Sequence, residues 1–194
     1  MTSGLVVGAD GAARCAWAGQ TPDYAAYHDH EWGRPVHGET ALLERFTLEA
    51  FQSGLSWLTI LRKREGFRRA FAGFDAGRVA AFGADDEARL LADASIVRNG
   101  AKIRAAIGNA RATVALRAED GLDALVWAFA PDPLPRRPRS PAEARSTSPE
   151  SVALAESLHR KGFSFVGPTT AYAAMQACGL VDDHVQGCHV VARC

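Results

Sequence analysis

The chain has 194 residues, 47% of them hydrophobic, which is enough apolar material for the core of one domain, or of one domain and a small lobe. It carries 22 basic and 22 acidic residues, so its bulk charge indicates neither a nucleic acid nor a membrane surface as the partner. Because no stretch approaches the roughly 20 apolar residues that span a bilayer, and the N-terminus lacks the pattern of a signal peptide, we expect a cytoplasmic protein that does not contact a membrane.

The chain is expected to begin with a flexible lead-in over residues 1–14, followed by a short helix within Thr21–Gly33. Thr21 can cap this helix, and Pro22 suits its first turn, where a missing N–H costs nothing. Gly33 then ends the segment.

One face of this first helix is chemically unusual. Tyr24, Tyr27 and His28 are three and four residues apart and share a face, and Glu31 and Trp32 continue it one turn further. A buried stripe is normally Leu, Ile and Val, whereas these groups suit a flat polar ligand or a metal. The alternative is an ordinary amphipathic helix with aromatic side chains in the core and His28 hydrogen-bonded nearby.

A second helix is predicted from Thr40 to about Ser53, and Glu49 falls within its apolar stripe, which contains Leu42, Leu43, Phe46 and Ala50. A carboxylate in that position is costly unless it has a partner. The alternative is that the stripe drifts around the helix and leaves Glu49 at its edge, in water.

The rest of the chain also predicts helices. Capping residues and apolar periodicity indicate helices that start at Trp57, Asp75, Asp85, Asn99, Leu122 and Ser148. Five prolines make residues 131–148 the clearest irregular segment, which we interpret as a surface loop. No alternating strand pattern is present, so the predicted fold class is all-α.

Basic residues gather in two places on this neutral chain, Arg62–Arg69 and Arg98–Arg117. Such asymmetry is what a phosphate-binding face would produce, although a solvated surface explains the charges equally well. Individual candidates for phosphate contacts are Arg62, Lys63, Arg98, Lys102 and Arg104.

A second motif suited to DNA lies near the C-terminus. Gly162 stops one helix, an apolar turn follows, and Gly167 opens the next helix, which is the pattern of a helix-hairpin-helix element. The N–H groups at the start of such a helix can bind a DNA phosphate without reading sequence. The DNA-binding candidates are therefore Phe165, Val166, Gly167 and Thr169, and the alternative is a tight helical turn around a buried phenylalanine.

A metal site is the third pattern. His184 and Cys188 are four residues apart, and together with Cys15 and His28 they form a Cys2His2 set, the donors of a closed tetrahedral zinc site. Four protein ligands leave no position for water, so such a zinc would be structural and would join the two ends of the chain. The spacing is not that of a standard zinc finger, and the competing ligands are His30, His37, Cys178 and His189.

Taken together, these motifs resemble those of the type I 3-methyladenine DNA glycosylase family, whose members remove 3-methyladenine from alkylated DNA. The resemblance extends in order from CAW at residues 15–17 through DYAAYHDHEWG, LEAFQSGLSWLTILRKR, AKIRAAIGNARA, GFSFVG and MQACGLVDDHVQGC, and so ends at Cys188. It covers most of the chain with long motifs.

The resemblance implies a helix-hairpin-helix glycosylase fold with a second lobe that zinc clasps. Residues 1–194 would form one unit, with a central helical lobe at about 40–130, a zinc-clasped lobe formed by about 15–39 and 148–190, and a Pro/Arg-rich loop at 131–147. The family's zinc ligands correspond to the same four residues that the spacing suggested. Asp182 and Asp183 stay unassigned.

The resemblance also implies a base pocket. The carboxylate that recognises the base corresponds to Glu49, and Glu49 and Tyr27 are the catalytic candidates. The residues expected to bind the base are Trp17, Tyr24, Tyr27, Trp32, Glu49 and Trp57. The partner would be double-stranded DNA containing 3-methyladenine, the product free 3-methyladenine, and the enzyme a monomer.

The chemistry of 3-methyladenine fits these residue types. A base must be flipped out of the duplex to be reached, and methylation at N3 makes adenine cationic. Aromatic faces attract a flat cation, and a carboxylate adds charge-assisted hydrogen bonds. The competing hypothesis is a zinc-stabilised helical DNA-binding module without glycosylase activity. A thiol-redox protein is disfavoured because no Cys-x-x-Cys pair is present.

Overall fold

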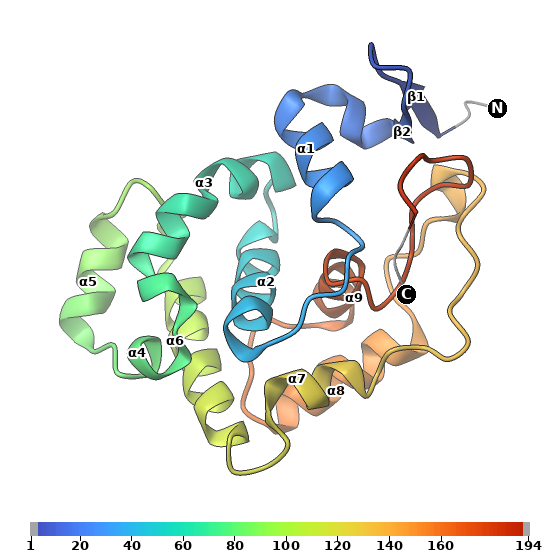
Figure 1. Ribbon diagram of the computed structural model, residues 1–194. Helices are drawn as coiled ribbons and strands as arrows, with labels where there is room; N and C mark the ends of the chain where they lie inside the picture. The colour runs from blue at the N-terminus through green and yellow to red at the C-terminus, as the bar shows by residue number, and fades with distance from the viewer. Residues whose placement is uncertain (1–3, 192–194) are drawn as a thin grey trace.

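The structure is a computed structural model that describes residues 4–191, and most of these residues are helical (Figure 1). A two-stranded antiparallel sheet, β1 (Leu5–Val7) and β2 (Ala13–Cys15), comes first. The α-helices that follow are α1 (Pro22–His30), α2 (Glu39–Gln52), α3 (Trp57–Ala70), α4 (Ala76–Ala80), α5 (Ala84–Ala92), α6 (Gly100–Leu116), α7 (Gly121–Trp127), α8 (Pro149–Arg160) and α9 (Pro168–Ala177). Short 3-10 turns lie at Ala16–Gln20, Ala72–Phe74 and Pro141–Glu143.

The N-terminal segment differs from the flexible lead-in that the sequence predicted. Residues 4–15 form a β-hairpin in which Leu5 pairs with Cys15 and Val7 with Ala13. The Asp10 side chain accepts a hydrogen bond from the Ala12 N–H at 3.1 Å and stabilises the turn. Strands of three residues are too short to produce an alternating pattern, so no sequence pattern predicts this hairpin. Residues 1–3 lie outside the described residues.

Most predicted helix starts are confirmed by their caps. The side chains of Thr21, Ser56, Asn99 and Ser148 each accept a hydrogen bond from a backbone N–H of the first turn. The start of α5 is a correction, because Gly83 occupies the cap position and Asp85 lies inside the first turn. The Asp86 carboxylate there accepts from the Gly83 N–H.

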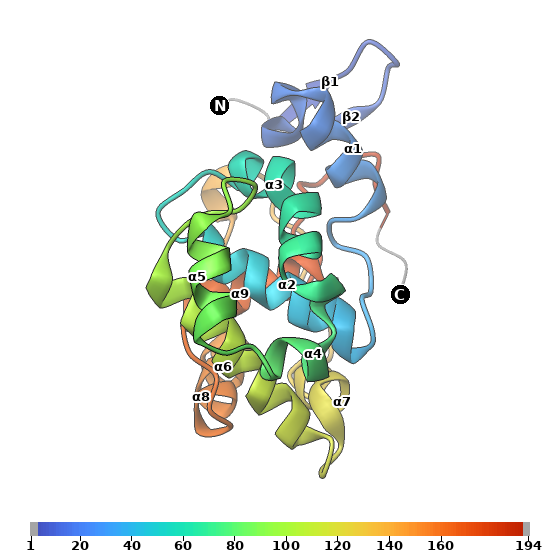
Figure 2. The same ribbon diagram turned by 90° about the vertical axis from the view of Figure 1, so that its left-hand side faces the viewer.

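Helix α2 forms the centre of the molecule. It packs against α3, α6, α7 and α9, and the views in Figures 1 and 2 place it among these helices. Its buried residues include Leu42, Phe46 and Phe51, which join the main apolar core. Glu49 is buried on the same helix with only 6% of its surface exposed, so the edge-of-stripe alternative is wrong.

The two ends of the described chain meet beside this helical body. The His189 N–H donates to the carbonyl of Ala13, and the Gln186 N–H donates to the carbonyl of Pro138 in the Pro/Arg-rich loop. A small apolar cluster separate from the main core forms there, made up of Cys15, Val185, Cys188 and Val190. No helix within residues 4–191 is long and apolar enough to span a bilayer.

Candidate functional site

A cavity of about 170 Å³ opens between the first helix, the central helix α2 and α9. All six residues that were expected to bind the base line it. The complete lining is Trp17, Tyr24, Tyr27, Trp32, Glu49, Gln52, Trp57, Ala173 and Gln176. Residues from five segments of the chain therefore meet in one cavity whose walls are mainly aromatic.

The aromatic walls pack edge to face and hold one another in place. The Trp17 ring lies 5.5 Å from the Tyr24 ring and 5.2 Å from the Trp32 ring, with interplanar angles of 86° and 81°. Tyr27 lies 5.3 Å from Trp57, centroid to centroid. Such contacts leave the cavity little freedom to collapse.

Two of the aromatic side chains that line the cavity carry polar groups. The Tyr24 hydroxyl accepts a hydrogen bond of 2.9 Å from the Leu58 N–H, which fixes α1 against the first turn of α3. The indole N–H of Trp57 is buried and has no partner within residues 4–191, so a donor is available to a ligand.

Glu49 provides the carboxylate of the cavity. Burial raises its pKa to about 8, and the positive charge of Arg45 partly offsets that effect. No hydrogen bond from residues 4–191 reaches its oxygens, so both can accept from a ligand. Tyr27 is buried beside it, and its pKa is raised first by burial and then by the charge of Glu49. A cation that enters the cavity would favour ionised Glu49.

Behind the cavity lies an ion-pair network that the sequence reasoning missed. Arg45 and Arg64 both donate to the Glu31 carboxylate, and Arg45 is one turn before Glu49 on α2. One Arg45 nitrogen, Nη1, is buried without a partner in the described part of the chain. The sequence signal for this network is the i, i+4 spacing of Arg45 and Glu49 on a helix whose face is buried.

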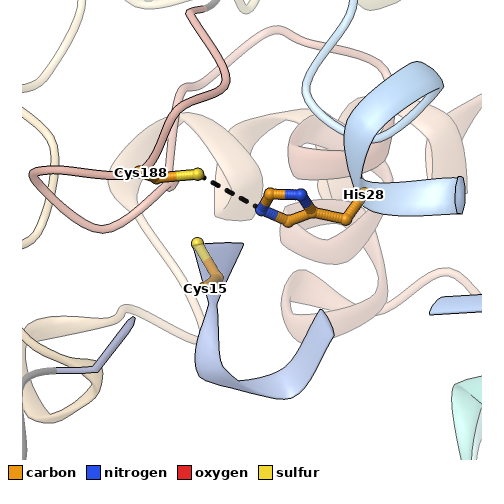
Figure 3. Close-up of side chains that lie close together, drawn as sticks. All are labelled: Cys15, His28 and Cys188. Atoms are coloured by element: carbon orange, nitrogen blue, oxygen red, sulfur yellow. Dashed lines mark hydrogen bonds between the residues drawn. The ribbon is translucent and has the colours of Figure 1, made fainter. Parts of the chain in front are cut away.

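A cluster of cysteine and histidine side chains lies at the meeting point of the two chain ends. Cys15, His28 and Cys188 place their donor atoms within 4.8 Å of one another, and all three side chains are buried (Figure 3). The Cys188 Sγ lies 3.4 Å from His28 Nε2. A hydrogen bond from Cys15, together with His28, holds the pKa of the Cys188 thiol well below its usual range.

His184, the fourth predicted ligand, lies beside this group. Its ring centroid is 5.0 Å from that of His28, and its Nε2 is buried without a hydrogen-bond partner in residues 4–191. Gly33 makes room for the ring, because a Cβ at that position would lie 2.7 Å from His184 Cε1. Two sulfurs, an imidazole nitrogen and an orphaned buried nitrogen are a donor set that fits Zn²⁺.

Among the competing ligands, His189 comes close, because its donor atom and those of His28 and Asp29 lie within 4.8 Å of one another. His30 is exposed at the end of α1. His37 lies elsewhere, stacked on Trp127 and hydrogen-bonded to Asp123. Cys178 is buried behind the cavity, where desolvation raises its pKa to about 12. His189 contacts Asp29, which also binds His28 Nδ1.

The two unassigned aspartates have separate surroundings. Asp182 accepts from His184 Nδ1 at 2.8 Å and from Arg137 of the Pro/Arg-rich loop. Asp183 accepts from the Tyr172 hydroxyl and the Gln176 amide. Gln176 lines the cavity, so Asp183 supports the cavity wall while Asp182 supports the cysteine–histidine cluster.

The hairpin between α8 and α9 presents an exposed turn. Phe165 has a φ of +58° and leaves 46% of its surface exposed, whereas Phe163 of the same turn is buried, as the alternative of a tight turn around a buried phenylalanine requires. A Cβ on Gly167 would meet nothing within 4 Å, so the backbone at the start of α9 is open to a close approach. Val166 is buried, and Thr169 is exposed in the first turn of α9.

Most basic candidates for phosphate contacts already have internal partners. Arg62 pairs with Asp23, Arg104 pairs with Glu87, and Lys63 donates to the carbonyl of Ala94. The other two behave differently. The buried Lys102 Nζ donates to backbone carbonyls in and just beyond the last turn of α2, whereas the exposed Arg98 has no hydrogen bond to residues 4–191.

The chain is similar to known proteins that contribute to the interpretation of the cavity and the cysteine–histidine cluster. The family model described as methyladenine glycosylase matches residues 17–191. The chain is 46% identical to DNA-3-methyladenine glycosylase 1 of Escherichia coli (strain K12) over 178 residues, 90% of this chain and 95% of the relative.

Two solved structures are also similar. A crystal structure of 3-methyladenine DNA glycosylase I has a TM-score of 0.87 at 45% identity and covers 91% of this chain and 98% of its own. A tyrosine variant of 3-methyladenine DNA glycosylase I, solved in complex with 3-methyladenine, has a TM-score of 0.85 at 31% identity, with 91% and 96% coverage. The chain belongs to the methyladenine glycosylase family.

Proposed function

We propose that the protein is a DNA repair glycosylase that hydrolyses the N-glycosidic bond of 3-methyladenine in double-stranded DNA and releases the free base. One observation carries this proposal: a buried carboxylate, Glu49, shares a cavity with five aromatic side chains. A protein that only binds DNA has no need for that combination. The relatives are themselves glycosylases, and this favours the enzyme over the DNA-binding module.

The cavity accounts for selection of an alkylated base. Aromatic faces such as Trp57 and Tyr27 attract a flat cation by about 0.5–2 kcal/mol for each favourable contact, more than they attract a neutral base. Ionised Glu49 accepts charge-assisted hydrogen bonds from the adenine edge. Flipping is also cheapest for a damaged base, so charge, shape and base pairing act in the same direction.

The reaction needs little acid catalysis, because the cationic base departs as a neutral molecule. In our proposal Glu49 and Tyr27 hold the extruded base, the aromatic walls exclude bulk solvent from it, and water attacks the sugar. The step forms no covalent enzyme intermediate. A borohydride-trapped enzyme–DNA adduct would contradict this mechanism.

We further propose that Cys15, His28, His184 and Cys188 bind a structural zinc ion. The orphaned His184 Nε2 beside the other three donors supports this assignment. A four-coordinate zinc with four protein ligands supplies a cross-link between distant segments and leaves no open position for substrate. Zinc would thereby define the second lobe, formed by about 15–39 and 148–190, beside the central lobe at about 40–130.

For DNA binding we propose a helix-hairpin-helix element over α8 and α9. The contacts would come from Phe165, Val166, Gly167 and Thr169, with N–H groups at the start of α9 facing a phosphate. The exposed Phe165 and the open space at Gly167 support the close approach of DNA. The enzyme would act as a monomer in the cytoplasm.

The test is release of free base from methylated duplex DNA, analysed by chromatography, with wild-type enzyme and Glu49→Gln. We expect 3-methyladenine release by the wild type. The variant should lose about 10- to 100-fold in kcat/KM, because a hydrogen bond to a charged group contributes about 1.5–3 kcal/mol. No release by the folded wild type would favour the DNA-binding module. Equal release by both proteins would remove Glu49 from its role.

A further inference from the structure

His28 and His184, the two histidines near the cysteines, make the same kind of contact with a carboxylate. His28 Nδ1 lies 2.8 Å from Asp29 Oδ1, and His184 Nδ1 lies 2.8 Å from Asp182 Oδ1. A carboxylate can only accept, so Nδ1 carries the proton in each ring and Nε2 keeps its lone pair. His28 Nε2 faces the cluster, 3.4 Å from Cys188 Sγ, and His184 Nε2 is buried without a partner in residues 4–191.

Each carboxylate is in turn held by an arginine from another segment. Arg14 of strand β2 binds both oxygens of Asp29 through Nε, at 3.0 Å each. Arg137 of the Pro/Arg-rich loop binds Asp182 through Nε and donates to the Val190 carbonyl at 2.8 Å through Nη2. Both carboxylate side chains are largely buried, with 13% and 14% of their surface exposed, so solvent competes little for these contacts.

The two arginines also connect histidine segments to cysteine segments. Arg14 directly precedes Cys15 in the chain, and Val190 lies two residues after Cys188. The first network therefore joins the segment of His28 to the segment of Cys15, and the second joins the segment of His184 to that of Cys188. The two networks therefore orient both histidines and connect their segments to the segments that carry the two cysteines.

We propose that Asp29 and Asp182 are positioning residues that set the tautomer and the orientation of His28 and His184 for the metal, and that Arg14 and Arg137 hold the two carboxylates in place. This inference rests on the zinc site proposed above. It gives Asp182 a role at the metal cluster, away from the base cavity. It also assigns a task to the Pro/Arg-rich loop, which the sequence predicted only as a surface connection.

The test compares zinc binding by wild type, Asp29→Ala and Asp182→Ala through competition with a chromophoric chelator. Carboxylates that support metal-bound histidines contribute about 10- to 100-fold to metal affinity, and we expect that loss in each alanine variant. Asp29→Asn and Asp182→Asn keep an oxygen that accepts from Nδ1, so both should bind zinc within about threefold of wild type. Asp123→Ala is the matched control, because it breaks a carboxylate–histidine pair with His37 outside the cluster.

Unchanged zinc affinity in both alanine variants would overturn the proposal, and so would an equal loss in the Asp123→Ala control. A second measurement needs no substitution, in case the alanine variants do not fold. Long-range ¹H–¹⁵N spectra of the zinc-loaded wild type should show the proton on Nδ1 of both His28 and His184; a proton on Nε2 of either would contradict the proposal.

Failure at this level can be distinguished from failure of the broader proposals. A wild type that takes up no zinc would overturn both the metal site and the positioning role. The glycosylase proposal would then be tested by base release alone. A wild type that binds zinc and variants that bind it equally well would overturn only the role of Asp29 and Asp182.

Discussion

The cavity depends on a single buried carboxylate whose charge state is sensitive to its neighbours. Burial raises the pKa of Glu49 to about 8, so most of the free protein holds a neutral carboxyl at pH 7. The ionised form, which binds a cationic base best, gains population as pH rises. Arg45 counters burial with its positive charge, and its own position is fixed by Glu31.

This leads to a prediction about pH dependence. The kcat/KM of the wild type for 3-methyladenine in DNA should rise with pH through about 8, because kcat/KM reports ionisation of the free enzyme. Arg45→Met removes the charge that lowers the pKa of Glu49, so its profile should shift to higher pH. The measurement is base release under single-turnover conditions at a series of pH values and constant ionic strength.

Two variants serve as controls for that profile. Arg64→Met removes the other arginine that binds Glu31, and it should leave the midpoint unchanged because Arg64 does not act on the Glu49 pKa. Glu49→Gln has no carboxyl to titrate, and its low activity should not show the rise. A rise in the glutamine variant would assign the titration to a different group.

At the scale of elements, the turn between α2 and α3 shows how a buried cation can support a site that it does not enter. Lys102 of α6 donates from Nζ to the Phe51 carbonyl at 2.9 Å and to the Ser53 carbonyl at 2.6 Å. These are C-terminal carbonyls of α2 and its cap, which have no partner within the helix. Gln52, on the same turn, lines the cavity.

We expect Lys102→Met to lower the free energy of unfolding by about 1–3 kcal/mol, since the carbonyls of the buried Phe51 and of the exposed Ser53 both lose a charged donor. It should also raise KM, because the turn that carries Gln52 becomes free to move. Urea unfolding and steady-state kinetics measure the two effects. Lys63→Met is the matched control: its ammonium donates to one carbonyl, that of Ala94, in an exposed position, and the variant should stay within about 0.5 kcal/mol of wild type.

The same scale shows what the sequence could and could not predict. Helix starts were predictable because a cap is a local contact, as at Asn99 and Ser148. The β-hairpin over residues 4–15 was not, because its strands are short and its stability comes partly from Arg14 reaching Asp29 on another element. The error at Asp85 has another cause: the cap, Gly83, has no side chain that would mark it in the sequence, and the acidic residues lie inside the first turn.

The candidate site also has parts that the sequence predicts and parts that it does not. Helical spacing predicted the shared aromatic face of α1 and placed Glu49 within the apolar stripe of α2, but it left open whether Glu49 is buried or lies at the edge of that stripe. The opposite wall, with Ala173 and Gln176 from α9, could not, because side chains so far along the chain meet only after folding. Phosphate contacts were the weakest inference, since charge alone does not reveal which cations already have partners, as Arg62 and Arg104 do.

At the scale of the whole molecule, the buried apolar surface is distributed unevenly between the helical body and the meeting point of the chain ends. The main apolar core surrounds α2, α3, α6 and α9, whereas the meeting point of the chain ends has only a small apolar cluster. There the backbone depends on polar contacts, such as the Val185 N–H that donates to Cys15 Sγ at 3.3 Å. A region with little buried apolar surface needs another source of stability, which a zinc clasp would supply.

Removal of the metal should therefore affect one end of the molecule first. At zinc concentrations about 100-fold above Kd, binding adds about 2.7 kcal/mol to the stability of the native state. For a chain of this size, chelation should then lower Tm by about 5–10 °C. The measurement is thermal unfolding with and without chelator, and Cys188→Ser should unfold at the lower temperature in both conditions.

Hydrogen exchange locates that loss within the fold. After chelation the amides of Val185 and His189 should exchange faster, because their acceptors lie on the N-terminal hairpin that zinc would hold in place. Amides inside α2 and α6 should keep their protection, since the main core does not include the cluster. Glu49→Gln should respond to chelator as the wild type does, because the cavity carboxylate is not a ligand. Uniform acceleration across α2 and α6 would mean that the clasp and the core unfold as one unit, and the division into two lobes would be wrong.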